Sequence, residues 1–257
     1  MSPIIVIVML ALIMMMTYRN MKMMARYRHN KGYIACYQEM LENNPDAYRH
    51  LIEYMENESS EEYKNKARVF KIYYELDDDT YQNELSILNF HDWYYKDGKI
   101  DKERISYNSD SIIWLLLLMA KANQTNHKDV IEAIYEKMLN EKEAYENTIE
   151  YKLIENTHKL FMEGKDTEIP FLNELVIGEY EGLQYDKQLI GMYKRIAEAL
   201  LAYKGEELDE FYQEDLTNFS MNTIGSTFLK HLEIFDRFNK PTEETLDNDV
   251  EEENIEE

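Results

Sequence analysis

Apolar and polar positions follow a helical period along most of the chain beyond residue 34, and short polar stretches separate the periodic segments. One helix is predicted to begin at Asn44-Pro45, because Asn caps helices and Pro suits the first helical position. Further helices are predicted near 60–76 and 80–96. The run "SIIWLLLLMAKA" after Ser109-Asp110 is apolar on every side, which predicts a central buried helix. Strand-like alternation is almost absent, so the predicted fold class is all-α.

The chain also repeats itself weakly at an offset of 41 residues. Three segments that begin at Leu118, Lys159 and Leu200 align without gaps, each as a long helix, a tight turn and a second helix. The aligned positions are Met119, Leu160 and Leu201 in the first helices, Asn123, Gly164 and Gly205 at the turns, and Val130, Phe171 and Tyr212, then Ile134, Leu175 and Leu216, in the second helices. Such a hairpin cannot bury its apolar face alone, so the repeat predicts a stacked-hairpin, α-solenoid-like body similar to tetratricopeptide or HEAT repeats. An ordinary helical domain with helices of similar length is the alternative.

The run "PIIVIVMLALIMMMTY", residues 3–18, has no charged side chain. As a helix it would span about 24 Å at about 1.5 Å per residue, and the methionines that follow can extend it toward a hydrocarbon core of about 30 Å. We therefore predict one membrane-spanning helix over about residues 3–24. The predicted anchor residues are Ile4, Leu10 and Ile13 in the apolar run and Arg19, Lys22 and Arg26 beyond it. A cleaved signal peptide and an interfacial helix are the alternatives, but the run lacks a preceding basic segment, a small-residue cleavage site and a polar face.

Charge is unevenly distributed. Residues 1–31 carry +5 and the whole chain carries −23, so the remaining residues carry −28. Basic residues after the span predict a single-pass protein of the cell membrane with its amino terminus outside and its body cytoplasmic, and segment 19–31 would contact anionic lipids of the bilayer. We expect residues 32–240 to form the helical body, and residues 241–257, with nine acidic side chains and no basic one, to form a disordered tail. The acidity argues against nucleic acid and favours another protein with a basic surface.

The segment "DWYYKDGKID", residues 92–101, looks like the middle of a calcium-binding loop. With Gly98 in the sixth place, Asp97 and Asp101 take the fifth and ninth places. The first, third and twelfth places then hold residues without a suitable oxygen, namely Trp93, Tyr95 and Arg104. We therefore predict no calcium site but a structural turn at Gly98, preceded by a helix that ends at Lys96.

Glu155 and His158 have the Glu-x-x-His spacing of helical di-iron sites, because residues three apart share a helix face. No other His has a Glu three residues before it, so no metal site is predicted. Gly-rich phosphate loops and Gly-x-Ser-x-Gly motifs do not occur. The single cysteine, Cys36, is predicted to be a buried apolar residue. Helix-spaced tyrosines are predicted to be half-buried with their hydroxyls in water: Tyr73, Tyr74 and Tyr81. No catalytic residue and no cofactor is predicted.

Residues 59–117 contain an Ala-Arg helix at Ala67-Arg68, a Leu-Asn-Phe segment at 88–90 and a Gly-x-Ile-Asp turn at 98–101. In these features the segment resembles a family of single-span bacterial membrane proteins of uncharacterised activity, in which an amino-terminal span precedes a small helical domain. The resemblance covers under a quarter of the chain. It implies the anchor and the helical body, and it implies no site residue.

Two functions are open from the residues alone. The first is a membrane-anchored helical scaffold that binds another protein. The second is a helical enzyme whose site is assembled from dispersed Glu, His and Tyr residues. An enzyme should show a deep pocket with converging titratable groups, whereas a scaffold should show an open groove or a broad apolar patch.

Overall fold

The computed structural model describes residues 14–18, 47–57, 61–96, 98–100, 109–178 and 187–239. The chain divides into two compact units, Met1–Ala67 and Arg68–Glu257, and the division falls inside α3 (Glu61–Glu75). In the first unit, residues 14–18 are helical and α2 spans Ala47–Glu56. After α3 follow η1 (Leu76–Asp78), α4 (Gln82–Ile87), α5 (His91–Tyr94), β1 (Tyr95–Lys96), β2 (Lys99–Ile100), α7 (Ser109–Gln124), α8 (Lys128–Asn140), α9 (Lys142–Tyr145), α10 (Ile149–Glu163), α11 (Pro170–Ile177), α12 (Lys187–Lys204), α13 (Glu210–Ser220), α14 (Thr223–His231) and α15 (Phe235–Phe238). Apart from two strands of two residues each, the elements of the described residues are helical, which confirms the predicted all-α class.

The predicted membrane-spanning helix lies mostly outside the described residues. Its described part, residues 14–18, is helical and its side chains are exposed. Among the residues that the structure describes, no helix is both long enough and apolar enough to cross a bilayer. Several predicted features also lie outside them, namely the anchor residues Ile4, Leu10, Ile13, Arg19, Lys22 and Arg26, then Cys36, and the tail 241–257.

The continuous helix predicted near 80–96 is wrong, because the chain leaves the helical conformation at Leu88, where ψ is 131°. Leu88 and Phe90 are both buried, while Asn89 between them is exposed. Burial of alternate residues is the pattern of extended chain, so a helix cannot continue through this stretch. The side chain of Asn89 then accepts from the backbone N–H of His91 at 2.8 Å, where the short helix α5 begins.

The turn predicted at Gly98 is confirmed, since its φ is 73°. The turn does not follow a helix, however, because it connects two short antiparallel strands. Tyr95 pairs with Ile100, and Lys96 pairs with Lys99. The predicted helix end at Lys96 is therefore wrong, because that residue lies in β1. An Asp-Gly pair is the usual sequence signal of a two-residue hairpin, and the chain carries this signal at Gly98.

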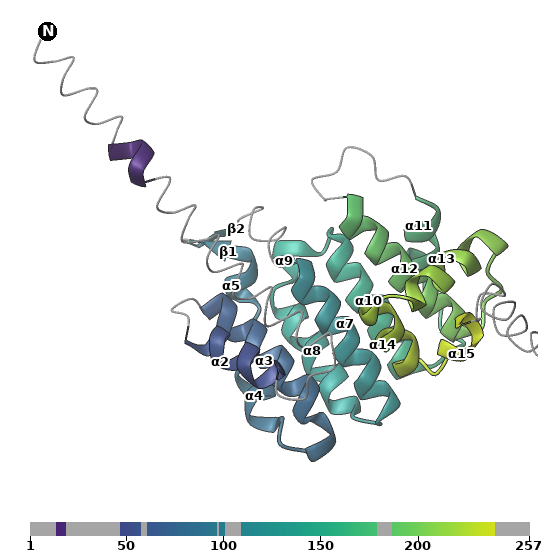
Figure 1. The fold of residues 1–257 in the computed structure, drawn as a ribbon, viewed down its shortest axis with the longest axis horizontal. Coiled ribbons are helices and arrows are strands. Elements are labelled where there is room, and N and C mark those ends of the chain that lie inside the picture. The colour runs from purple at the N-terminus through teal and green to yellow at the C-terminus, as the bar shows by residue number, and fades with distance from the viewer. Residues whose placement is uncertain are drawn as a thin grey trace, which may run out of the picture. The chain divides into compact units, whose positions relative to one another are not determined.

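α7 is a central helix of the second unit, as its apolar run predicts. All of residues 111–122 are buried. Figure 1 shows α7 in the middle of the helical body, and α8, α10 and α14 pack against it. Aromatic rings join α7 to α3: the ring of Trp114 lies 4.6 Å from that of Phe70 and 5.6 Å from that of Tyr73. α3 itself confirms the helix predicted near 60–76.

The three predicted hairpins are present as α7–α8, α10–α11 and α12–α13. Six of the aligned positions are buried: Met119, Leu160 and Leu201 in the first helices, and Ile134, Leu175 and Leu216 in the second helices. α10 packs against both α7 and α12, so successive first helices are neighbours. The turn residues Gly164 and Gly205 have φ values of 98° and 102° directly after α10 and α12, which confirms both predicted turns.

The turn of the first hairpin lies later than the repeat predicts. Asn123 is still inside α7, and the residue with positive φ is Asn126, at 63°. An alignment without gaps cannot account for the extra length of α7. The residues four positions before Ile134, Leu175 and Leu216 are also predicted to face inward. Val130 is buried, but Phe171 and Tyr212 are only half-buried.

α14 returns to the first hairpin, because it packs against α7 as well as against α12 and α13. The start of α14 lies close to the end of α13. A Cβ added at Gly225 would collide with the backbone carbonyl of Phe219, so glycine is required there. Asn222 caps α14 by accepting from the N–H of Gly225 at 2.7 Å. The contact between α14 and α7 closes the sequence of hairpins, whereas the repeats of an open solenoid contact only their neighbours.

Candidate functional site

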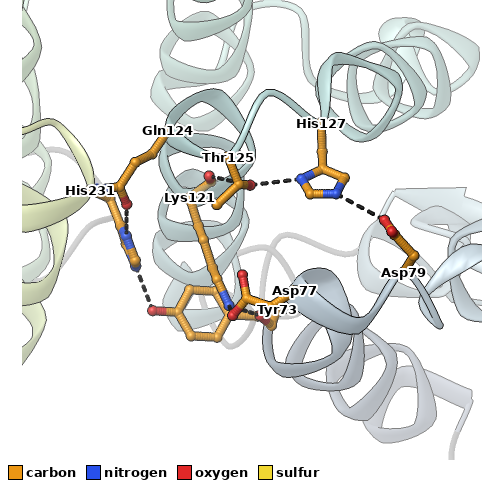
Figure 2. Close-up of polar contacts among 8 residues, drawn as sticks. All are labelled: Tyr73, Asp77, Asp79, Lys121, Gln124, Thr125, His127 and His231. Carbon is orange, nitrogen blue, oxygen red and sulfur yellow. Dashed lines mark hydrogen bonds and ion pairs between the residues drawn. The ribbon is translucent and has the colours of Figure 1, made fainter.

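A polar network joins α3, α7 and α14 at the carboxyl end of α7 (Figure 2). Its residues come from three distant segments: Tyr73, Asp77 and Asp79 from α3 and the turn after it, Lys121, Gln124, Thr125 and His127 from α7 and the turn after it, and His231 from the end of α14. All of them belong to the second unit. The network therefore fixes how three sequence-distant helices meet.

Lys121 is buried, with 9% of its surface exposed, and its ammonium group reaches two acceptors. Nζ donates to the backbone carbonyl of Tyr73 at 2.8 Å and to Oδ2 of Asp77 at 2.9 Å. It also lies 5.0 Å from the centre of the Tyr73 ring. A buried cation is costly unless it is paired. Here the carboxyl end of α3 provides the partners, and the helix dipole favours a cation at that end.

Tyr73, His231 and Gln124 form a hydrogen-bonded chain. The hydroxyl of Tyr73 lies 2.7 Å from Nε2 of His231, and Nδ1 of His231 lies 2.8 Å from Oε1 of Gln124. Nε2 of Gln124 donates to the carbonyl of Lys230 at 3.4 Å, which directs the amide oxygen of Gln124 toward the histidine. An amide oxygen only accepts, so Nδ1 of His231 carries the proton and Nε2 accepts from Tyr73. His231 is therefore neutral in this arrangement.

The electrostatics of the site agree with this assignment. Burial lowers the pKa of His231 to about 4; the Lys121 cation also lowers it, and the Asp77 carboxylate opposes the shift. Burial raises the pKa of Tyr73, and the neighbouring Tyr74 and Asp77 raise it further. Both groups are thus uncharged at neutral pH, and the hydrogen bond between them is one between neutral partners.

Thr125 and His127 extend the network from α7 to the turn before α4. The Thr125 hydroxyl donates to the carbonyl of Lys121 at 2.9 Å, and its oxygen lies 2.7 Å from Nδ1 of His127. Nε2 of His127 lies 3.1 Å from Oδ1 of Asp79. These contacts connect the turn after α7 to the turn before α4.

The side chains of Tyr73, Lys121 and His231 form their hydrogen bonds within the protein, whereas the carboxylates of Asp77 and Asp79 are exposed. Tyr73 donates to His231, which donates in turn to Gln124, and Lys121 is held between a carbonyl and a carboxylate. A general base needs an acceptor within reach of a substrate, and a nucleophile needs a base beside it. Tyr73, Lys121 and His231 provide neither, whereas the Thr125 hydroxyl lies 2.7 Å from Nδ1 of His127, whose Nε2 lies 3.1 Å from Oδ1 of Asp79. The contacts of Tyr73, Lys121 and His231 hold α3, α7 and α14 together, and they involve the neutral form of His231.

A second group of titratable residues lies on α12 and α13, which pack together. Glu198 on α12 is 1% exposed, and its Oε2 has no hydrogen-bond partner among the described residues. Burial raises the pKa of Glu198 to about 8; Asp215 on α13 raises it further, and Arg195 and Lys194 oppose the shift. Glu198 is thus mostly protonated at neutral pH. Lys194 also caps α11, since it donates to the carbonyls of Val176 at 3.2 Å and Gly178 at 2.7 Å.

The structure gives Glu155 and His158 different partners. Nε2 of His158 lies 2.8 Å from Oε2 of Glu132, and its ring stacks on Tyr135 with 4.0 Å between the ring centres. Glu155 instead lies 3.9 Å from Nζ of Lys159. In the parts of the chain that the structure describes, no group of three or more potential metal ligands gathers.

The prediction for the helix-spaced tyrosines is wrong for two of the three. Tyr74 is half-buried, as predicted, but Tyr73 and Tyr81 are buried and their hydroxyls bond inside the protein. Tyr73 bonds to His231, and Tyr81 donates to Oδ2 of Asp129 at 2.9 Å. Burial and the bond to Asp129 raise the pKa of Tyr81 to about 12. These partners come from distant segments, so spacing within one helix cannot reveal them.

Two residues of these sites carry a signal in the sequence, although neither belongs to a known motif. Lys121 is the one charged residue in the apolar run 111–122, and Glu198 is the one charged residue in the apolar run 196–202. A charge on an otherwise apolar helix is buried with partners or shifts its pKa. No comparable signal in the sequence pairs His231 with any other residue.

Comparison of the chain with family models, with curated proteins and with solved structures gives no match. Its function is therefore inferred from the fold and the contacts described above.

Proposed function

We propose that the chain is a membrane-anchored helical scaffold that binds another protein at the membrane. One observation carries this proposal: α10 packs between α7 and α12, and each second helix packs against the first helix of its own hairpin. Stacked helical hairpins form extended surfaces that other proteins bind. The return of α14 to α7 ties the last helices of this stack to its first hairpin.

Each second helix also exposes one large apolar side chain. Leu139 in α8, Ile177 in α11 and Phe211 in α13 are 38%, 72% and 67% exposed. Single exposed apolar residues are common on protein surfaces. Their occurrence on the second helix of every hairpin supports a role as contacts for a partner.

The anchor rests on the sequence. Residues 3–18 carry no charge, and the basic residues of segment 19–31 follow them. We place the body on the cytoplasmic side because basic residues flank the cytoplasmic end of membrane spans. The resemblance of residues 59–117 to single-span membrane proteins implies an anchor followed by a helical body. The basic segment would hold an acidic body close to an anionic membrane that otherwise repels it.

A helical enzyme is the alternative function, and the polar network favours the scaffold. An enzyme needs titratable groups that are free to act on a substrate. Tyr73, Lys121 and His231 instead bond to one another and to the backbone, in contacts that position α3, α7 and α14.

Chemical crosslinking in intact cells, followed by purification of the full chain, tests the scaffold. We expect one other protein to be enriched with the chain and, without crosslinker, to be removed by high salt, because salt screens the charge of an acidic body. Leu175→Ala is the control, since it should lose about 2 to 5 kcal/mol of stability and disrupt the stack. This variant should lose the partner. Recovery of the chain alone after crosslinking would contradict the proposal.

A further inference from the structure

The outer surface of α13 and the turn before it combine an aromatic ring with carboxylates. We define the α13 face by its exposed residues, Glu207, Asp209, Glu210, Phe211 and Glu214. Residues 206–215 contain six acidic side chains and no basic one. Phe211 lies among these acids with 67% of its surface exposed, so the face is both apolar and anionic.

Phe211 is not part of the packing that holds α13 in place. α13 packs inward through Leu216 and Phe219, which are buried. The residues three and four positions after Phe211 are Glu214 and Asp215, so its neighbours on the helix surface are acidic. The Phe211 ring contacts Tyr212 edge to face, with 5.5 Å between the ring centres. Most of the ring remains open to a partner.

A buried carboxyl group lies behind this face. Glu198 of α12 is buried, its Oε2 lacks a hydrogen-bond partner among the described residues, and it interacts electrostatically with Asp215. The cations that oppose this acidity, Arg195 and Lys194, lie on α12 and not on the α13 face. A cation that docks beside Asp215 would interact favourably with that carboxyl group, whereas the buried Glu198 behind it is mostly protonated at neutral pH.

We propose that the α13 face binds a cationic segment of the partner protein, in which lysine or arginine side chains flank one apolar side chain that covers Phe211. This inference rests on the proposed scaffold function and identifies its binding surface. Carboxylates around an exposed ring complement that arrangement in charge and in polarity. Nucleic acid and an anionic bilayer are repelled by the same carboxylates. A bound metal ion would leave Phe211 without a role.

Binding of synthetic peptides to the full chain in detergent tests this surface. The probe is a lysine–leucine peptide, compared with an oligolysine of equal length and with a glutamate–leucine peptide. We expect the lysine–leucine peptide to bind more tightly than oligolysine and the glutamate–leucine peptide not to bind. Phe211→Ser should weaken the lysine–leucine complex about tenfold or more, because a covered phenyl ring is worth about 1.5 to 3 kcal/mol.

The acids are tested with two matched triple variants. Glu207→Gln/Asp209→Asn/Glu210→Gln should weaken binding and reduce its salt dependence. Glu163→Gln/Asp166→Asn/Glu168→Gln removes three exposed acids near the turn of the preceding hairpin and should retain binding. Equal losses from the two triples, or unchanged binding in Phe211→Ser, would overturn the α13 face as the site.

The two proposals fail in different ways. If a partner protein is crosslinked in cells and Phe211→Ser retains it, the α13 face is wrong and the scaffold stands. If the peptide binds as expected but no protein is crosslinked, the surface stands and the scaffold function fails. Circular dichroism of Phe211→Ser should match that of the unaltered chain, because this side chain is mostly in water.

Discussion

The hydroxyl of Tyr73 donates to Nε2 of His231 across 2.7 Å, although 158 positions separate the two residues along the chain. This bond joins α3 to α14, and Gln124 of α7 holds the other nitrogen of the same ring. The position of α14 against α7 therefore depends on a few polar atoms as well as on apolar packing. The Tyr73 hydroxyl and Nδ1 of His231 each donate to one acceptor, so a substitution that removes one polar atom tests one hydrogen bond.

Removing the Tyr73 hydroxyl should destabilise the fold. Tyr73→Phe leaves the buried Nε2 of His231 without its donor, which should lower the free energy of unfolding by about 1 to 3 kcal/mol. Urea denaturation of the full chain in detergent measures this loss. Tyr212→Phe, a half-buried tyrosine on α13, is the control and should change the free energy by less than about 0.5 kcal/mol. Equal losses of unfolding free energy in both variants would show that the hydrogen bond to His231 does not stabilise the fold.

His231 should make the protein less stable in acid. Its pKa is about 4 in the folded protein and 6.5 ordinarily, so the unfolded chain binds a proton more readily. Stability should therefore be unaffected by His231 above about pH 6.5 and should fall as the pH drops from there toward about 4. Denaturation across this range compares the chain with His231→Gln, which should show a shallower decline. Parallel curves would contradict the lowered pKa.

Glu198 should make the protein less stable as the pH rises, which is opposite to the effect of His231. Its pKa is about 8 in the folded protein and 4.5 ordinarily, so stability is lost as the pH rises from about 4.5 to about 8. Glu198→Gln keeps the shape of the side chain without its charge. The free energy of unfolding of this variant should exceed that of the unaltered chain by about 1 to 3 kcal/mol near pH 8. The difference should vanish toward about pH 4.5. A variant that is less stable near pH 8 would mean that the Glu198 carboxylate is stabilised by a partner.

The orientation of the anchor can be tested separately from the fold. With the basic residues after the apolar run, we expect the body to stay in the cytoplasm. A phosphatase reporter fused after Glu257 should therefore be inactive. The control is a chain in which Arg19, Lys22 and Arg26 are replaced by Gln, which should raise the fraction of active reporter. Strong activity in the unaltered chain would reverse the proposed orientation.

Local pattern accounts for the parts of the fold that the sequence predicts. Helical periodicity and the apolar run 111–122 identify the helices and the central position of α7. The turns at Gly164 and Gly205 follow because glycine readily adopts the positive φ of a helix end. The burial of Ile134, Leu175 and Leu216 in the three second helices follows from the repeat, in which these positions align.

The parts of the fold and of the site that the sequence does not predict depend on contacts between distant segments. Tyr73 meets His231 only because α14 returns to α7, and no periodic pattern encodes that return. The requirement for Gly225 arises from the nearby carbonyl of Phe219 in another helix. At Leu88 the helix ends, and the apolar–polar–apolar order of Leu88, Asn89 and Phe90 is typical of extended chain. Helical propensity alone favours a helix that continues through these residues.

Site-specific photo-crosslinking in living cells tests the central claim, that the stacked hairpins bind another protein, most directly. A photoreactive residue would replace, one at a time, the exposed apolar side chains Leu139, Ile177 and Phe211, with the exposed polar positions Glu163 and Lys187 as controls. We expect Phe211 and at least one of the other two apolar positions to give a covalent adduct with the same second protein, and the controls to give none. Adducts at no apolar position, or equal adducts at the controls, would contradict the scaffold.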